Sequence, residues 1–459
     1  MNAGYRKDVL LIVLLSLFIY NINLRVIYRS SDALPAEYLP YSILTEGDLD
    51  LNEFPQLYEN PNITKEYPPK PVGAIRGETL YRLHYSIGLL QGNYSSLYPI
   101  GSSLLATPLY VIPVFLLSIP PDSWMIPYLA KFSAAVFCAL SSVFLYLAIA
   151  ELYSRKTAFH MSLAYAFATH TFSVASQDLW QHAATQMLLA LTLLLLLKAQ
   201  KDKRFAPLSG IPLSLSVFVR PTNAIFAFLF ILYVFHKHRN QFLKFLAYLA
   251  PISFTLAYYN LHYFNTLLGG YRFVEEFEHG IGSYLNFFNP VGLLGVLVSF
   301  DRGIFFYSPF LVYALWGIRR AWRKNVLFPY AALACGAYVY FTSTLTDWWG
   351  GTSFGYRVLS DMLPFMVFFI AEVYDAIRAD IGHRVVFTFL VAASVFVQLV
   401  GFLLYDAGDV TSIPPITTLE ESQLYYYLHD VRPIVCTPDW AAGNISCRKT
   451  ILFSGEEDV

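Results

Sequence analysis

The chain has 459 residues, a formal net charge of −1, and only 14% charged residues against 56% hydrophobic ones. Soluble domains carry about 25% charged residues, so this composition excludes a soluble enzyme, and without a positive excess nothing indicates a nucleic-acid partner. Mean hydropathy is +0.47, and apolar runs recur from end to end. The chain is therefore predicted to be an all-α integral membrane protein with many transmembrane helices.

The first apolar run covers residues 9–24 and follows Arg6 and Lys7. No small-residue cleavage site follows this run, so we expect an uncleaved first span rather than a signal peptide. The positive-inside rule then places the N-terminus in the cytoplasm. The polar residues 28–100 are expected to form a large first extracytoplasmic loop that carries short juxtamembrane helices.

Residues 100–119 are apolar but are interrupted by Pro108 and Pro113, which favours a segment at the outer interface over a clean span. Beyond it, apolar runs alternate with Lys- and Arg-rich turns, and together they predict about eleven spans. The predicted spans are 9–24, 128–152, 160–176, 183–197, 208–219, 222–235, 242–264, 304–318, 326–342, 359–374 and 385–405. This organisation gives one transmembrane domain, 1–405, and a short extracytoplasmic tail, 406–459.

Two further features agree with this topology. Asn-X-Ser/Thr acceptor patterns begin at Asn62, Asn93 and Asn444, all in segments placed outside, although such patterns also arise by chance. Cys436 and Cys447 lie in the polar tail, where a disulfide would form if the tail faces an oxidising compartment.

Polar side chains collect at the outer ends of the predicted spans. They are Asp32, Asp178, His182, Arg220, Asp301, Arg302, Asp347, Trp348, Trp349 and Arg357. Charges near the membrane core usually mark function, so this distribution indicates a cavity open to the outer face. The alternative is that these residues only anchor helix ends at the interface.

Asp32 follows the first span, where its carboxylate could take a proton from an acceptor hydroxyl or, alternatively, cap a short helix. Further along the same loop, Glu46, Asp48, Asp50 and Glu53 form an acidic cluster, in which the first three are the candidate ligands of a divalent metal ion. A solvated acidic loop is the simpler explanation of that cluster.

Three arginines could bind a lipid phosphate. Arg220 follows the run 208–219, Arg302 precedes a later span, and Arg357 ends the glycine-rich turn 350–357. An arginine can pair with a phosphate through two parallel hydrogen bonds. Glycines in the turn would let the backbone approach that phosphate closely.

The order of these motifs resembles the GT-C superfamily of membrane glycosyltransferases, which includes aminoarabinose transferases and protein O-mannosyltransferases, and looks like an uncharacterised prokaryotic branch of it. The resemblance covers residues 31–357 and not the tail. It is carried by Ser31-Asp32 with Leu39-Pro40-Tyr41-Ser42-Ile43-Leu44, Tyr98-Pro99-Ile100-Gly101, Ser176-Gln177-Asp178-Leu179-Trp180-Gln181-His182, Arg220-Pro221-Thr222-Asn223, Arg302-Gly303 with Tyr307-Ser308-Pro309, and Trp348-Trp349-Gly350-Gly351 through Gly355-Tyr356-Arg357.

The resemblance implies a GT-C-like bundle and transfer of a hexosyl or pentosyl group from a polyprenyl- or dolichyl-phosphate donor. The acceptor would be a glycan, lipid or protein on the outer face of the cell membrane. Asp32 matches the position of the catalytic Asp, and its neighbours Ser31 and Ala33 depart from members with two adjacent acidic residues, which leaves a metal requirement open.

The resemblance also assigns roles to the other polar residues of the set. The cations that it implies near the donor phosphate are Arg220, Arg302 and Arg357. For the transferase hypothesis that follows, the substrate-binding residues expected are Tyr98, Gln177, His182, Trp348 and Trp349.

Other functions remain open on the sequence alone. A lipid or glycan transporter or flippase would use similar helices without chemistry, but such proteins often carry internal repeats and midplane sites, and no convincing repeat is found here. A ligase that moves a whole glycan from a pyrophosphate lipid, and a non-catalytic lipid-binding member, are two further alternatives.

Overall fold

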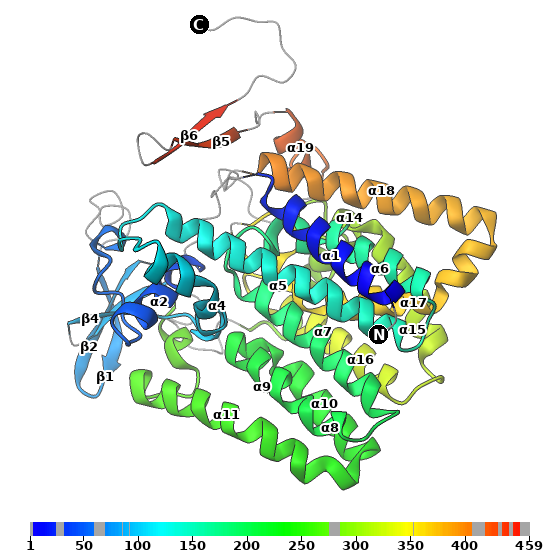
Figure 1. Cartoon of the computed structure of the whole chain (residues 1–459), viewed down its shortest axis with the longest axis horizontal. Coiled ribbons are helices and arrows are strands. Elements are labelled where there is room, and N and C mark those ends of the chain that lie inside the picture. The colour runs from blue at the N-terminus through cyan, green and yellow to red at the C-terminus, as the bar shows by residue number, and fades with distance from the viewer. Residues whose placement is uncertain are drawn as a thin grey trace, which may run out of the picture.

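The computed structural model describes residues 3–23, 32–58, 69–84, 86–90, 92–274, 285–351, 353–405, 418–429, 434–439 and 444–449. Its helices pack into a bundle whose long axes run broadly in one direction, with α7 (Gln181–Ala199) in the middle (Figure 1). α11 (Phe242–Phe264) lies along one edge and α18 (Ile381–Leu404) along the opposite edge (Figure 1). The expected mostly helical architecture is confirmed.

The remaining elements follow in chain order. The other helices are α1 (Ala3–Asn21), α2 (Leu34–Thr45), α4 (Gly101–Val111), α5 (Met125–Ala150), α6 (Arg155–Phe167), α8 (Phe205–Leu208), α9 (Gly210–Val219), α10 (Ala224–Lys237), α13 (Pro290–Val298), α14 (Ile304–Tyr307), α15 (Tyr313–Ala321), α16 (Leu327–Thr344), α17 (Leu363–Ala379) and α19 (Gln423–His429). Short 3-10 or π turns are η1 (Pro55–Leu57), η2 (Ile112–Leu116), η3 (Thr171–Ala175), η4 (Pro221–Asn223), η5 (Arg239–Gln241), η6 (Gly269–Phe273), η8 (Pro309–Val312) and η9 (Arg357–Met362).

Four helical segments of the described residues are long and apolar enough to cross a membrane: Met125–Ala150, Gln181–Ala199, Arg239–Phe273 and Ile381–Leu404. They differ in burial, because 83% of the most apolar window of Gln181–Ala199 is buried inside the protein but only 11% of that in Arg239–Phe273. The exposed apolar surface of α11 is the kind that lipid would cover. The number of eleven spans stays a prediction.

Two predicted spans are interrupted in the structure. The span 160–176 contains the end of α6 at Phe167 and then the π turn η3. The span 304–318 breaks at Ser308, whose φ of −141° is extended, because Pro309 disfavours a helical residue before it and cannot donate to the preceding turn. Both breaks lie beside the polar site described below.

The first outer loop holds a four-stranded antiparallel sheet, β1 (Lys70–Ile75), β2 (Glu78–His84), β3 (Ile87–Leu90) and β4 (Asn93–Ser96), which the all-α prediction omits. β1 and β2 are joined by Arg76 and Gly77, both with positive φ (52° and 88°), as in the two-residue turns that suit a twisted hairpin. This sheet lies with α2 and α4 at one end of the bundle (Figure 1). A second hairpin pairs β5 (Ile434–Asp439) with β6 (Asn444–Lys449).

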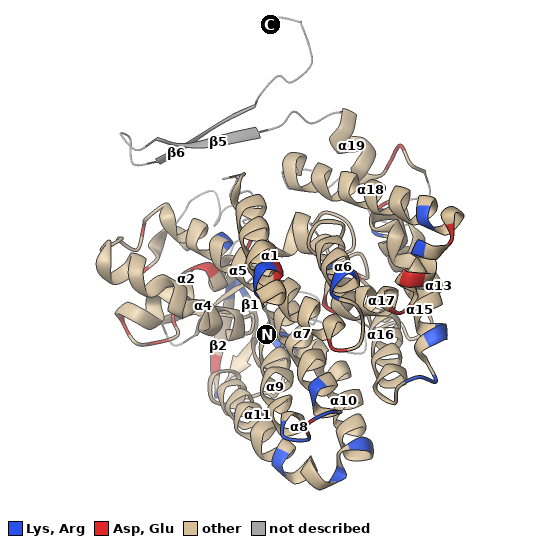
Figure 2. Ribbon diagram, turned by 45° about the vertical axis from the view of Figure 1, so that its right-hand side comes forward, with Lys and Arg blue, Asp and Glu red and all other residues tan. Residues whose placement is uncertain are grey.

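Buried side chains form two apolar clusters, one inside the bundle and one between the bundle and the first outer loop. The larger cluster fills the bundle between α5, α7, α10, α16 and α17, and includes Phe226, Phe230 and Phe365. The second cluster joins α2, α4 and the sheet to the first half of α5, and includes Leu39 and Ile87. Lys and Arg gather at helix ends near α8, α10, α11 and α15 rather than along helix middles (Figure 2). The second cluster thus holds α2, α4 and the sheet against one end of the bundle, which we call the loop end. The polar residues of the candidate site meet at this end.

Candidate active site

Asp32 lies at the turn that leads into α2, and both of its carboxylate oxygens are engaged. Arg357 Nη1 lies 2.7 Å from Asp32 Oδ2, and the Tyr98 hydroxyl donates to Oδ1 at 3.1 Å. The Asp32 side chain is 22% exposed and that of Arg357 is 11% exposed. Three residues that the sequence predicted to share a site are therefore in contact at the edge of the protein interior.

Tyr98 reaches Asp32 from the segment between β4 and α4. Burial raises the pKa of the Tyr98 hydroxyl well above its usual range, and the charge of Asp32 acts in the same direction. The hydroxyl therefore stays protonated and donates. The ring packs edge-on against Tyr271 at 5.1 Å between centroids, and the Tyr271 hydroxyl donates to Gln181 Oε1 at 3.0 Å.

Arg357 is held on three sides. Its guanidinium stacks on the Trp180 ring at 4.1 Å from the centroid, and its Nη2 donates to the Gly350 carbonyl at 2.6 Å. Asp32 completes the set. Within the described part of the chain, Nε of Arg357 is buried without a hydrogen-bond partner, so the site keeps one unused cationic donor.

The glycine-rich turn that carries Arg357 needs its glycines, because Gly350, Gly351 and Gly355 all have positive φ, between 60° and 77°. Arg302, only 7% exposed, donates to the carbonyl of Ser353 at 2.5 Å and to that of Gly351 at 3.3 Å, and pairs with Asp301 at 3.1 Å. The structure therefore places Arg302 against the turn that presents Arg357, not beside Asp32.

Two more side chains fasten the same turn. Gln423 of α19 donates to the Ser353 carbonyl at 3.0 Å and accepts from the Gly355 amide at 2.8 Å. His170 Nε2 lies 2.6 Å from the Phe354 carbonyl. A C-terminal helix and a π-turn segment thus fix the backbone just before Arg357.

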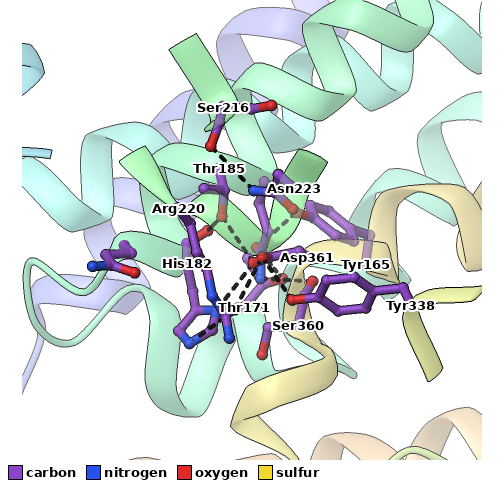
Figure 3. A network of polar contacts seen from close by, with 12 residues as sticks. Tyr165, Thr171, His182, Thr185, Ser216, Arg220, Asn223, Tyr338, Ser360 and Asp361 are labelled. Atoms are coloured by element: carbon purple, nitrogen blue, oxygen red, sulfur yellow. Dashed lines mark hydrogen bonds and ion pairs between the residues drawn. The ribbon is translucent and has the colours of Figure 1, made fainter. Parts of the chain in front are cut away.

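Arg220 belongs to a second, deeper group of residues (Figure 3). Its Nη1 lies 3.0 Å from Asp361 Oδ2 and 2.7 Å from His182 Nδ1. His182 Nδ1 is also 3.0 Å from Asp361 Oδ1. An imidazole nitrogen either donates or accepts, so only one of its two contacts is a hydrogen bond at a time.

The two groups of residues are close neighbours. Tyr271 lies within electrostatic range of Arg220, Asp32 and Arg357. The charges of Arg220 and Arg357 therefore both act on the Tyr271 hydroxyl.

The other predicted substrate-binding residues point elsewhere. Gln177 is 5% exposed and donates to the Phe172 carbonyl and the Ser176 hydroxyl, close to it in the chain. Trp348 is buried in the larger apolar cluster, and Trp349 packs edge-on beside it at 5.9 Å. Their roles toward a substrate stay predictions.

The acidic cluster of the outer loop engages its own backbone. Asp48 accepts from the Asp50 amide, and Asp50 accepts from the Asn52 amide at 3.1 Å. Among the residues that the structure describes, no three His, Cys, Asp or Glu side chains are placed to hold a metal ion together. Glu46, Asp48 and Asp50 therefore do not fit a metal site as they stand, and no metal enters the chemistry below.

The tail cysteines lie opposite each other, since Cys436 and Cys447 are register partners of β5 and β6. Paired residues in antiparallel strands have Cα atoms about 4.5–5.5 Å apart, and disulfides span about 4.4–6.8 Å. The predicted disulfide is compatible with this register. Asn62 and Ser31 lie outside the described residues.

Sequence reasoning missed Asp361, Gln423 and the stacking role of Trp180. Asp361 carried a signal, because it is an acidic residue inside the predicted span 359–374, where a charge needs a partner. Trp180 lies between Asp178 and His182, in a motif whose polar residues were the candidates for a site, and no role was predicted for its indole ring. Gln423 gave no signal, since the tail has no apolar periodicity that ties it to the bundle.

The chain was compared with protein families, curated proteins and solved structures. The Alg9-like mannosyltransferase family matches residues 77–265, less than half of the chain. No curated protein matches.

Solved structures resemble most of the chain at low identity. The oligosaccharyltransferase of Archaeoglobus fulgidus in its apo form has a TM-score of 0.50 at 11% identity, covering 87% of this chain and 55% of its own. The same organism's oligosaccharyltransferase AglB, solved with an inhibitory peptide and a dolichol-phosphate, has a TM-score of 0.50 at 13% identity, covering 90% and 57%. ArnT from Cupriavidus metallidurans bound to undecaprenyl phosphate has a TM-score of 0.49 at 11% identity, covering 87% and 70%. The chain thus spans little more than half the length of the archaeal enzyme, and the similarity concerns the fold.

Proposed function

We propose that this chain, a membrane glycosyltransferase of the GT-C superfamily, moves a sugar from a polyprenyl-phosphate-linked donor to an acceptor on the extracytoplasmic face. The observation that carries the proposal is the contact of Asp32 with Arg357 and Tyr98 at the loop end of the bundle. A carboxylate base beside a cation is what transfer from a lipid phosphate requires.

The orientation rests on charge. Arg155 and Lys156 follow α5, Lys201, Lys203 and Arg204 follow α7, and Arg319, Arg320, Arg323 and Lys324 lie at the end of α15 and just after it. The positive-inside rule assigns these ends to the cytoplasm. The first loop with its sheet, and Asp32, then face outward, and the N-terminus faces the cytoplasm.

The proposed reaction consists of one proton transfer and the replacement of the bond between sugar and phosphate by a bond between sugar and acceptor. Asp32 takes the proton of the acceptor hydroxyl while that oxygen forms a bond to the anomeric carbon of the donor sugar. The bond from the anomeric carbon to the phosphate oxygen breaks, and polyprenyl phosphate leaves with the electron pair. Attack opposite the leaving group inverts the anomeric centre.

Arg357 and Arg220 would hold the phosphate as its negative charge grows. Arg357 is paired with Asp32 before substrate arrives, so a phosphate that competes for its guanidinium would release the carboxylate to act as a base. Nε of Arg357 has no hydrogen-bond partner among the described residues, but it is buried, so the phosphate would reach it only once the guanidinium turns away from Asp32. Binding of the donor and activation of the base would thereby be coupled through one side chain.

The experiment is transfer of labelled sugar from a polyprenyl-phosphate donor in proteoliposomes, with the wild type, Asp32→Asn, and Asp122→Asn as a matched control. Asp122 is an exposed acid in the loop before α5. Loss of a general base typically costs about 10²- to 10⁴-fold in rate. We expect that loss for Asp32→Asn and none for the control.

Full activity of Asp32→Asn would remove the base assignment. Movement of the lipid across the bilayer by the wild type, without any covalent product, would instead favour a transporter.

A further inference from the structure

Asp361 is the most completely engaged carboxylate of the site, and no motif of the sequence points to it. Oδ1 accepts from the Thr185 hydroxyl at 2.8 Å and lies 3.0 Å from His182 Nδ1. Oδ2 accepts from Arg220 Nη1 and from the Tyr338 hydroxyl, both at 3.0 Å. Its side chain has 0% exposure, so it can neither reach a substrate nor give up an oxygen to one.

The four partners come from separate parts of the chain. His182 and Thr185 lie on α7, Arg220 ends α9, and Tyr338 lies on α16, while Asp361 itself lies in η9 just before α17 (Figure 3). Asp361 is therefore the point where these elements are fastened together. Because its surroundings hold it on every side, any group that it binds is also held in place.

Arg220 uses only part of its guanidinium for this contact. In the described part of the chain, its side-chain polar contacts are all made by Nη1, to Asp361 and to the ring nitrogens of His182. The side chain is 13% exposed, and neither Nε nor Nη2 is among the fully buried unpaired atoms. The Nε–Nη2 edge is thus not fully buried and has no protein partner among the described residues, and such an edge suits a phosphate with two parallel hydrogen bonds.

We propose that Asp361 is a positioning residue that holds Arg220 by Nη1 so that its Nε–Nη2 edge receives the donor phosphate. This inference rests on the proposed function for the identity of the ligand. It also explains the residue type, because an arginine can bind a carboxylate with one nitrogen and a phosphate with the other edge. A lysine ammonium can contact two anions, but it has no planar edge, so it could not give a phosphate two parallel hydrogen bonds while it pairs with Asp361.

A stabilising role alone would make a different prediction. A buried ion pair is weak evidence for stability, since desolvation offsets much of its attraction. The chain provides a matched comparison in Glu372, another buried carboxylate, which pairs with Arg320 at 3.4 Å and with Lys324. Glu372 lies on α17, the helix that directly follows η9. At a rise of 1.5 Å per residue it is about 16 Å from Asp361 along the helix axis, away from the site.

The test measures the Kd of purified, detergent-solubilised protein for labelled undecaprenyl phosphate, together with the melting temperature and, where transfer is active, KM and kcat. For Asp361→Asn we expect Kd and the donor KM to rise about tenfold, as for one lost charge-assisted contact, with a smaller change in kcat. Glu372→Gln should leave Kd and KM unchanged even where it lowers the melting temperature. An unchanged Kd in a folded Asp361→Asn protein overturns the inference.

A second variant keeps the test decisive if Asp361→Asn does not fold. Arg220→Lys retains a cation for Asp361, so it should fold, and we expect its Kd to rise as much as that of Arg220→Ala. Wild-type affinity in Arg220→Lys overturns the inference. Because Kd is measured without chemistry, a wild type that binds the lipid but transfers no sugar contradicts the proposed function alone.

Discussion

Arg357 and Asp32 form an ion pair with 2.7 Å between Nη1 and Oδ2, although 325 residues separate them in the chain. The pair joins the first outer loop to the glycine-rich turn that follows α16.

The stacking of Arg357 on Trp180 leads to the first prediction. Arg357→Lys keeps the charge but loses the planar group that stacks on the indole ring and donates to Gly350. We expect transfer to fall by at least about tenfold for Arg357→Lys, and Trp180→Leu to raise the donor KM, since a desolvated cation–π contact is worth about 2 kcal/mol. Initial rates over a range of donor concentrations check both, and a lysine variant with wild-type kcat/KM would show that charge alone suffices.

The clamp of Gln423 on the glycine-rich turn gives the second prediction. Gln423→Ala removes two hydrogen bonds to Ser353 and Gly355, so the turn before Arg357 should loosen and kcat/KM should fall about tenfold. Gln200→Ala is the matched control, because Gln200 exchanges two amide hydrogen bonds with Asn325. The account of the clamp fails if both variants affect transfer equally.

The third prediction concerns pH. Burial raises the pKa of Glu53 above its usual range, and burial likewise raises that of Asp50. A raised carboxyl pKa in the folded state means that this group favours folding fully below its ordinary pKa and loses that contribution as pH rises through the raised value. At pH 8 the partly buried Glu53 carboxylate is charged, so replacing it with neutral glutamine should raise the melting temperature. Toward pH 5 the Glu53 carboxyl takes up its proton, so the melting temperatures of Glu53→Gln and the wild type should converge. Melting curves across that range test it, with the exposed Glu46→Gln as control, and an advantage that grows toward pH 5 would reverse the sign.

The fourth prediction concerns the tail hairpin. Cys436 and Cys447 are register partners, and we expect them to form a disulfide if the tail is extracytoplasmic. Mass spectrometry of protein alkylated without reduction should find these two thiols unlabelled and linked. Alkylation of both thiols in native protein would place the tail in a reducing compartment or exclude the bond.

Hydropathy predicted the helices well where they are continuous. The predicted span 242–264 coincides with α11 (Phe242–Phe264), and 385–405 differs from α18 (Ile381–Leu404) by a few residues. It failed where a polar site interrupts a helix, as at Ser308–Pro309, because apolar composition does not report backbone conformation. The sheet of the first loop was missed because its strands are short, and because the side chains of β1 are mostly exposed and those of β4 are polar.

The site was predictable in part for a related reason. Asp32, Tyr98 and Arg357 stand out as polar residues beside apolar runs, and the structure brings them together. Asp361 and Gln423 are proposed to act through other residues, and the partners that they contact lie far away in the chain, Arg220 at 141 positions and Ser353 at 70. A single sequence contains no information on such contacts, so Asp361 stands out in it only as a charge inside an apolar run, and its partners appear once the packing is known.

The most direct test is an experimental map of the wild-type protein in lipid nanodiscs with bound undecaprenyl phosphate. The account predicts phosphate density within about 3 Å of the guanidinium groups of both Arg357 and Arg220, with the Asp32 carboxylate facing it from the acceptor side. Phosphate density bound elsewhere, with the Asp32–Arg357 pair intact and unapproached, would contradict it.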